Sequence, residues 1–133
     1  MPNPTKARVT LITMTSSFTP LVVENLLNRA ITPDQLPWQP LRSGVDICSL
    51  HQDGETGYHW ALLRYQPGAS VPLHHHPGYE QILVLSGQQK DDRGTYGPGS
   101  LIINLPGSQH QVTSAEGCVV LIFWQQPVVF NEP

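Results

Sequence analysis

The sequence predicts an all-β fold in which short strands close into a barrel, and three observations support this prediction. From Gly44 onward, short apolar runs alternate with turns rich in glycine and proline. The 133 residues include 13 prolines and 11 glycines, a composition typical of many strands joined by tight turns. The spacing of the runs fits a sandwich or a barrel. Because no internal repeat is visible, we expect one closed barrel.

The predicted strands follow one another between Gly44 and Trp124. Each is an apolar or alternating run that ends at a turn signal such as Gln52-Asp53-Gly54 or Pro67-Gly68. We expect strands over residues 45–50, 58–65, 70–76, 80–86, 100–104, 110–113 and 119–124, with shorter extended pieces at 88–90 and 95–96 beside the polar turn 91–94.

Residues 1–37 are predicted to form an N-terminal arm or short helix, and residues 38–133 the barrel. The segment Ala7–Met14 alternates as an edge strand or arm would. Pro20 precedes an apolar periodic run that ends near Ala30, and proline suits the first position of a helix. Residues 31–41 are rich in proline and predict an extended connector.

Composition excludes several classes of function. A net charge of −3 and the absence of any lysine or arginine cluster argue against binding to nucleic acid or to an anionic membrane. No apolar run approaches the roughly 20 residues that span a bilayer. The run Val9–Met14 is too short for a secretion signal, so we expect a cytoplasmic protein. Cys48 and Cys118 lie in strand-like runs without CxxC spacing, which indicates buried small side chains rather than a disulfide.

Three consecutive histidines and a nearby glutamate are the most unusual feature of the chain. Side chains on a strand alternate between its faces, so His74 and His76 point one way and His75 points the other. Glu80 heads the apolar run Ile82–Leu85, which places its carboxylate on a strand as well. Burying two imidazoles and a carboxylate on one interior face is unfavourable unless a partner compensates them. A divalent metal ion would do so.

Glycines and histidines recur at fixed spacings around this cluster. The first pattern runs Gly68, five residues, His74, one residue, His76, three residues, Glu80, six residues, Gly87, and the second runs Gly99, seven residues, Gly107, two residues, His110. This layout resembles the two signature motifs of the cupin superfamily, also called RmlC-like. The second motif departs from the family at Leu105 and Ser114, where proline and asparagine are usual. The resemblance implies a small double-stranded β-helix, the cupin jelly-roll barrel, and adds His110 as a fourth ligand.

The predicted metal ligands are therefore His74, His76, Glu80 and His110. Neutral imidazoles and a carboxylate suit zinc, iron, manganese or nickel, and we favour zinc or iron. A six-coordinate ion would keep two positions for water or a small-molecule ligand. Tetrahedral zinc bound by all four residues would keep none, which describes a structural or sensory site. The sequence leaves this choice open and assigns no catalytic residue.

A narrower resemblance lies within the cupins. The stretches 77–87, 92–110 and 114–118, and the opening Trp38-Gln-Pro40-Leu41, are similar to the cupin domain of ChrR-type anti-sigma factors. In that family the cupin domain follows an N-terminal domain that binds the sigma factor. That N-terminal domain also binds zinc through His and Cys ligands. Residues 1–37 hold no His and no Cys and are too short for that domain, so we expect no sigma-factor binding. Stand-alone members also resemble dioxygenases that cleave acetylacetone with iron held by histidines alone, a pattern from which Glu80 departs.

The resemblance favours a metal-binding single-domain cupin that binds a small ligand or senses an oxidant. The alternative is a non-haem iron(II) dioxygenase acting on a small dicarbonyl-type substrate, and a third hypothesis is a regulatory module for a partner chain. A homodimer is expected from the family, with Ala7–Met14 and the outward-facing Leu83 and Leu85 as candidate contacts.

Other polar and aromatic side chains are candidates for a cavity wall. His51 lies beside a polar turn and His59 on a strand whose face is undetermined. Either could line the mouth of a pocket, although we expect surface roles for both. Aromatic side chains in small barrels are typically core, yet six further residues could shape a cavity: Tyr58, Trp60, Arg64, Tyr79, Gln81 and Trp124.

Overall fold

The computed structural model describes residues 19–131, and the chain divides between Pro37 and Trp38 into an N-terminal unit and a barrel unit. The N-terminal unit contains helix α2 (Leu26–Ile31) and the 3-10 helix η2 (Pro33–Gln35). The strands of the barrel unit are β1 (Gln39–Arg42), β2 (Val45–Gln52), β3 (His59–Tyr65), β4 (Ala69–His75), β5 (Glu80–Gly87), β6 (Gln89–Asp91), β7 (Gly94–Tyr96), β8 (Leu101–Asn104), β9 (Gln109–Ser114), β10 (Cys118–Trp124) and β11 (Val129–Phe130).

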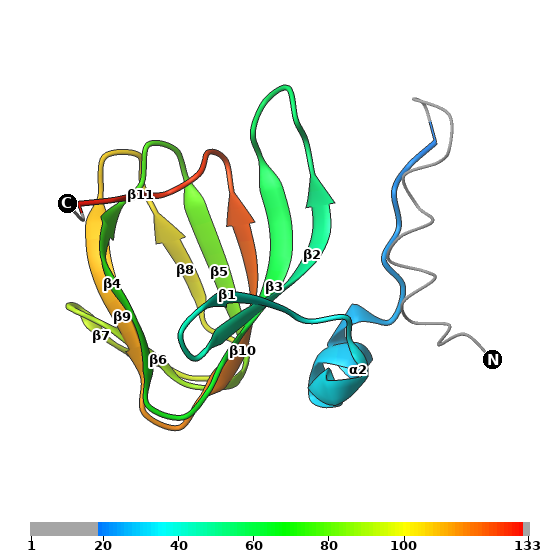
Figure 1. Cartoon of the computed structure of the whole chain (residues 1–133), viewed down its shortest axis with the longest axis horizontal. Coiled ribbons are helices and arrows are strands. Elements are labelled where there is room, and N and C mark those ends of the chain that lie inside the picture. Colours follow the sequence, from blue (N-terminus) through cyan, green and yellow to red (C-terminus); the bar gives the residue numbers. More distant parts are fainter. Residues whose placement is uncertain (1–18, 132–133) are drawn as a thin grey trace. The chain divides into compact units, whose positions relative to one another are not determined.

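The strands form two antiparallel sheets that enclose a common interior (Figure 1). The six-stranded sheet has the order β1-β2-β3-β10-β5-β8, and the five-stranded sheet has the order β11-β4-β9-β6-β7. From β3 to β11 the chain passes repeatedly from one sheet to the other, which is the connectivity of a jelly-roll barrel. The predicted all-β barrel is confirmed.

Aliphatic side chains that alternate along the strands fill the interior. On β5, Ile82 and Val84 are buried, whereas Leu83 between them is only partly buried. The same alternation on the other strands produces one core cluster, made of Val45, Ala61, Leu63, Tyr65, Val71, Ile82, Val84, Val112, Cys118, Val120 and Ile122. Burial of each larger aliphatic side chain contributes about 1.5–3 kcal/mol, so this core provides a rigid support for polar groups placed inside it.

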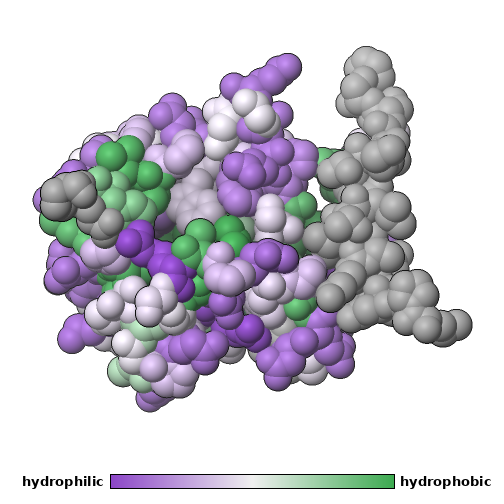
Figure 2. Space-filling model, viewed as in Figure 1, coloured by the Kyte–Doolittle hydropathy of each residue, from purple (hydrophilic) through white to green (hydrophobic). Residues whose placement is uncertain are grey.

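The outer surface carries both polar and apolar side chains. Figure 2 shows hydrophobic side chains gathered beside the C-terminal end of the chain, where Val129 of β11 is 43% exposed. The edge strand β8 exposes Leu101 and Ile103, which alternate with the inward-facing Ile102. The outer face of the larger sheet therefore offers apolar area at its β8 edge.

The strands predicted between residues 45 and 124 are confirmed, with ends that differ by one or two residues. Two strands lie outside the prediction. β1 contains Pro40 in the segment predicted as a connector, and proline is tolerated there because β1 is an edge strand. β11 has only two residues, too few for a hydrophobic pattern, and it forms by pairing with His74 and His75.

The helix predicted to begin at Pro20 begins instead at Leu26, so the prediction is wrong over its first part. Asn25 precedes the helix with a φ of 59°, a left-handed conformation that interrupts a right-handed helix and that asparagine adopts more readily than most residues. The predicted strand or arm at Ala7–Met14 lies outside the described residues. Among residues 19–131, no helix has the length and apolar character needed to cross a membrane.

Both cysteines are buried and neither forms a disulfide bond, as predicted. Cys118 belongs to the core cluster, and burial raises the pKa of its thiol above the usual value. Cys48, which is fully buried on β2, lies outside that cluster. Each behaves as a small apolar side chain.

Gly87 closes β5 at a point where two segments of backbone approach each other. A Cβ atom on Gly87 would collide with the backbone oxygen of Gly117, and its φ of 74° lies in the left-handed region. The facing Gly117 is equally confined, because its Cβ would lie 2.8 Å from the backbone oxygen of Tyr65. The glycine that ends the first sequence motif is thus required by this close approach.

Gly87→Ala is expected to lower the free energy of unfolding by about 2–6 kcal/mol, since backbone strain and overpacking add. Gly97→Ala is the matched control, because no atom lies within 4 Å of its Cβ position. That control should change stability by less than about 0.5 kcal/mol. Urea denaturation of both variants measures the difference, and equal stabilities would contradict the close-approach argument.

Candidate metal centre

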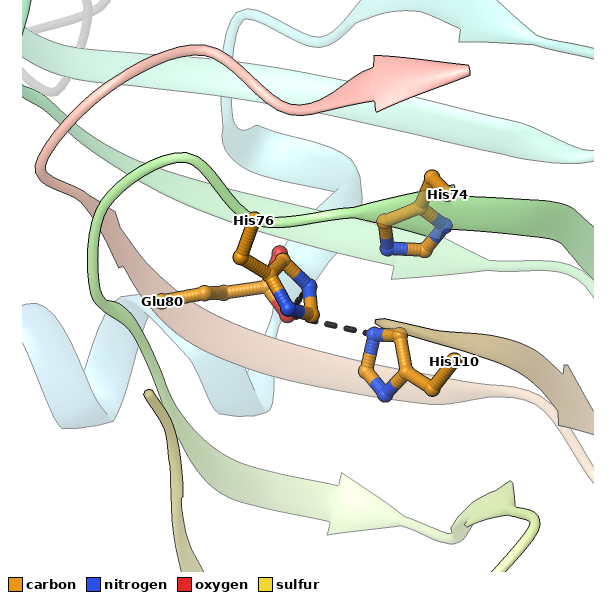
Figure 3. A group of neighbouring side chains, drawn as sticks. All are labelled: His74, His76, Glu80 and His110. Atoms are coloured by element: carbon orange, nitrogen blue, oxygen red, sulfur yellow. Dashed lines mark ion pairs between the residues drawn. The ribbon is translucent and has the colours of Figure 1, made fainter. Parts of the chain in front are cut away.

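Four buried side chains converge between the two sheets, and they are the four predicted ligands (Figure 3). His74, His76, Glu80 and His110 each offer one ligand atom, and these atoms lie within 4.8 Å of one another. None of the four residues is more than 4% exposed. His75, which separates two of them in the sequence, is half-buried and lies outside the cluster. The alternation argument therefore divided the three histidines correctly.

Strand pairing places these side chains. His74 on β4 lies directly opposite His110 on β9, and His76 follows the last residue of β4. The backbone N–H of His76 donates to the carbonyl of Ser108 at 2.8 Å, which fixes the chain at that point. Glu80 is the first residue of β5 and belongs to the other sheet. The cluster therefore joins the five-stranded sheet to the six-stranded sheet.

Each of the three imidazoles uses Nδ1 for a contact with a group outside the cluster. For His74, His76 and His110 the partners are, in order, the carbonyl of Pro72 at 2.8 Å, Oγ of Ser108 at 2.9 Å and Oδ2 of Asp91 at 3.4 Å. Outer contacts of this kind fix the orientation of a histidine ring and leave Nε2 available to bind a metal ion.

Ser108 determines which nitrogen of His76 carries the proton. Its hydroxyl donates its single hydrogen to the carbonyl of Leu105 at 2.5 Å, so it accepts a hydrogen from Nδ1 of His76. In the neutral ring, Nε2 of His76 then presents a lone pair. This atom lies 3.2 Å from Oε1 of Glu80, and Nε2 of His110 lies 3.3 Å from the same oxygen. Both nitrogens are buried and neither makes a hydrogen bond to any residue that the structure describes, so the arrangement fits a cation at its centre.

Side chains on the two neighbouring strands hold the carboxylate of Glu80. Asn104 on β8 donates to Oε1 at 3.1 Å, and Trp124 on β10 donates from Nε1 to Oε2 at 2.8 Å. Burial by itself would raise the pKa of Glu80, but the adjacent rings of His110 and His76 outweigh it and hold that pKa well below its usual range. The carboxylate is therefore ionised at neutral pH, as a metal ligand must be.

Asp91 on β6 is the centre of a second layer of polar contacts. Its carboxylate accepts from the backbone N–H of Arg93 at 2.8 Å and from the hydroxyl of Tyr96 at 3.1 Å. Burial would raise the pKa of Asp91, but these contacts outweigh it and lower that pKa. Burial would likewise lower the pKa of His110, but Glu80 and Asp91 outweigh it and raise that pKa. His110 thus lies between two ionised carboxylates.

Three of these supporting residues were not found from the sequence. Asn104 lies opposite Glu80 in the pairing of β5 with β8, a register that the sequence does not reveal. Ser108 follows Gly107 inside the second motif, which is the one signal that could have identified it. Asp91 begins the predicted polar turn and had the appearance of a solvent-exposed residue. Arg93 links this layer to the carboxylate, because it donates to Oδ1 of Asn104 at 2.7 Å.

A cavity of about 410 Å³ lies beside the cluster, within the usual range for small-molecule sites. His74, Glu80 and His110 line it on one side, and most of the remaining wall is aliphatic. His59 lines the wall as well, so the surface role expected for it is wrong. His51 is not part of the wall.

Of the six other wall candidates, only Trp124 lines the cavity. Tyr58, Trp60, Arg64, Tyr79 and Gln81 are not part of this wall. Strand alternation gives the reason for those on strands: Ala61 and Leu63 occupy the inward positions of β3, and Ile82 that of β5, so their neighbours face outward.

Comparison with known proteins identifies the family. Residues 28–128 match the family described as the ChrR Cupin-like domain. The chain belongs to this family. The ChrR-like cupin is 32% identical over 101 residues to the anti-sigma-E factor ChrR of Cereibacter sphaeroides, which covers 74% of this chain and 46% of ChrR. It is 31% identical over 67 residues to the putative dimethylsulfoniopropionate lyase DddL of the same organism, covering 47% of this chain and 29% of DddL. The chain thus spans less than half the length of either relative.

Solved structures share the barrel of this ChrR-like cupin. A chain of the complex of Rhodobacter sphaeroides SigE with the anti-sigma ChrR has a TM-score of 0.60 at 30% identity, covering 67% of this chain and 48% of that chain. An RmlC-like cupin protein from Ralstonia eutropha has a TM-score of 0.67 at 19% identity, covering 74% and 69%. A putative acetylacetone dioxygenase from Methylibium petroleiphilum has a TM-score of 0.73 at 18% identity, covering 90% and 86%. The last two show the fold alone, and the predicted cupin superfamily is confirmed.

The contact between Asp91 and His110 can be tested by metal titration of this cupin. Asp91→Asn removes the negative charge beside Nδ1 of His110, so the affinity of the cluster for zinc should fall by roughly 10–100-fold. Asp92→Asn is the matched control, because Asp92 is the next residue and is exposed. Competition with a chromophoric zinc chelator measures both affinities. Equal affinities for the two variants would show that Asp91 does not orient the ligand.

Proposed function

We propose that this chain is a metal-binding cupin of the ChrR-like type, in which His74, His76, Glu80 and His110 hold one divalent ion and the adjacent cavity binds a small ligand. The observation that carries the proposal is the pair of buried Nε2 atoms that make no hydrogen bond while facing one ionised carboxylate oxygen. An ion at their centre would bind both lone pairs and the carboxylate together. Zinc and iron are the ions that we favour.

Protonation alone satisfies the cluster less well than an ion does. A proton on Nε2 of His110 would pair that nitrogen with Glu80, yet Nε2 of His76 would still present its lone pair to the same oxygen. The tautomer of His76 is fixed by Ser108, so this ring supplies a hydrogen to the carboxylate only by becoming doubly protonated. A divalent ion removes the conflict for both rings, and this supports a resident metal.

When bound, the ion supplies positive charge that polarises a ligand in the cavity. The residues of the chain determine everything else about the site. Asn104 and Trp124 prevent rotation of the Glu80 carboxylate, and the contacts at Nδ1 prevent rotation of the rings. The aliphatic wall contacts the body of the ligand and excludes water. Four protein donors leave two coordination positions on a six-coordinate ion, where a ligand could bind the ion directly. They leave no position on tetrahedral zinc, and the site would then be structural or sensory.

Metal content tests the ligand assignment directly. Protein purified without chelators should contain about one divalent ion per chain. The double substitution His76→Ala and Glu80→Ala should abolish binding, because it removes one nitrogen and the only charged donor of the cluster. His75→Ala is the matched control and should keep the ion, since His75 lies outside the cluster. Elemental analysis by mass spectrometry gives the three contents, and an unchanged ion content in the double variant would disprove the site.

A second candidate function is that of a non-haem iron(II) dioxygenase acting on a small dicarbonyl-type substrate. The observation that favours it is the position of the cavity, whose wall includes three of the four cluster residues. A chelating substrate could therefore reach both open positions of a six-coordinate ion. The putative acetylacetone dioxygenase from Methylibium petroleiphilum has the same fold, which supports a barrel of this shape as a container for such a substrate.

Oxygen consumption distinguishes this second function from ligand binding alone. Iron(II)-loaded protein should take up oxygen when a dicarbonyl is added, and zinc-loaded protein should not, because zinc has no redox chemistry. An oxygen electrode with a panel of dicarbonyls, thiols and catechols makes the measurement. If the rate of oxygen uptake is the same with and without each compound, the chain is not a dioxygenase for these substrates.

Several expectations about partners stay predictions. A homodimer is supported by the exposed Leu101 and Ile103 on the edge strand β8. Residues 1–37 are proposed to form an N-terminal arm or short helix and residues 38–133 the cupin barrel, and a cytoplasmic location is still expected. SigE is the partner of ChrR in the solved complex. Sigma-factor binding by this chain is not part of our proposal, because residues 1–37 lack His and Cys.

A further inference from the structure

We propose that His59, oriented by Ser49, accepts the proton that a weakly acidic chelating ligand loses when it binds in the cavity. This inference rests on the proposed function, because it requires an ion at the cluster. It adds a proton-transfer residue that is neither one of the four cluster residues nor part of their hydrogen-bonded support.

The position of His59 is the first argument. It begins β3, two residues before the fully buried Ala61, so its side chain lies on the inner face of the strand. The same cavity is lined by His59 and by the cluster residues His74, Glu80 and His110. A ligand that reaches the cluster through this cavity is therefore exposed to the imidazole of His59.

The hydrogen bonding of His59 is the second argument. Nε2 lies 2.8 Å from Oγ of Ser49, and Nδ1 has no hydrogen-bond partner among the described residues. When Nε2–H donates to Ser49, Nδ1 carries a lone pair and can accept a proton. A histidine with one nitrogen fixed by a partner and the other free has the arrangement of a general base.

The surroundings of His59 are the third argument. Its ring lies 5.5 Å from the ring of Trp124, and Nε1 of Trp124 donates to Glu80 at 2.8 Å. Trp124 thus lies next to both His59 and Glu80. Burial lowers the pKa of His59, and the nearby His51 lowers it further. Arg42 is a charged residue that lines the same cavity, while Ser49 and Trp124 carry no charge. His59 is therefore neutral at neutral pH, and a ring nitrogen is available to accept a proton.

The chemistry identifies the class of ligand. Hydroxamic acids, catechols and enolisable dicarbonyls each bind a metal ion as the conjugate base of a neutral acid. On binding, the O–H bond breaks and its electron pair stays on the ligand oxygen, while the proton forms an N–H bond at Nδ1 of His59. No oxidant or reductant is needed. The transfer leaves the net charge of the cavity as it was before the neutral acid entered.

Proton release measured by calorimetry tests this role. Acetohydroxamic acid is a suitable probe because it is almost wholly protonated at neutral pH and chelates a divalent ion as its anion. Nickel is used as the ion, because it accepts six ligands and keeps two positions beside the four protein donors. Nickel-loaded protein is titrated with the probe in buffers of different ionisation enthalpy, which gives the number of protons released. Wild-type protein should retain the proton, whereas His59→Gln should release about one more proton to the buffer. His75→Gln is the matched control and should behave as wild type, because His75 lies outside the cluster and does not line the cavity.

The outcomes separate this inference from the function on which it rests. Wild-type protein that holds no divalent ion would overturn the proposed function and the role of His59 together. Equal proton release by nickel-loaded wild type and His59→Gln would overturn the role of His59 alone. Loss of nickel from His59→Gln would also overturn it, since His59 would then support the metal itself.

A measurement on unaltered protein covers the case in which His59→Gln does not fold. The ring nitrogens of the 6 histidines can be followed by nitrogen NMR in cadmium-loaded protein, because cadmium is diamagnetic and accepts six ligands. Addition of acetohydroxamic acid should convert one histidine from the neutral to the doubly protonated form. If every histidine keeps its protonation state, the proposed proton transfer is wrong.

Discussion

Oε1 of Glu80 lies 3.2 Å from Nε2 of His76 and 3.3 Å from Nε2 of His110, all inside the barrel. Without a positive charge among them, this contact is repulsive, because Ser108 obliges His76 to present a lone pair. The surrounding polar groups maintain the contact rather than relieve it: Asn104 and Trp124 anchor the carboxylate, and Asp91 holds the ring of His110. Such anchoring makes physical sense if the polar atoms are arranged for a cation that occupies the space between them.

The two sheets contribute unequally to this arrangement. The three imidazoles come from β4, from the residue that follows it, and from β9, whereas the carboxylate comes from β5 of the other sheet. An ion bound by all four would therefore link the sheets across the interior, in addition to the aliphatic core. Because binding to the folded state alone stabilises that state, folding and metal affinity are coupled in such a barrel. Glu80 provides this coupling, because it begins β5 and is the cluster residue that comes from the six-stranded sheet.

Much of the fold and of the site follows from alternation along strands, and the rest depends on register. The two-residue period separates His74 and His76 from His75, and the glycine and proline turns mark most strand ends. Asn104 and Asp91 could not be found in this way, because their role depends on which strand lies opposite Glu80 and His110. His59 is missed for a related reason. It is the first residue of β3, and a strand end leaves the facing of a side chain ambiguous until the pairing is known.

The shortest strand of the barrel has a consequence for access to the site. β11 pairs with β4 through only Val129 and Phe130, and Phe130 lies opposite His74 with the guanidinium of Arg42 4.1 Å from its ring. Phe130, Pro127 and Val128 all belong to the cavity wall. So short a pairing can open locally while the core stays intact. Detachment of this C-terminal segment would uncover one wall of the cavity while the two sheets stay folded.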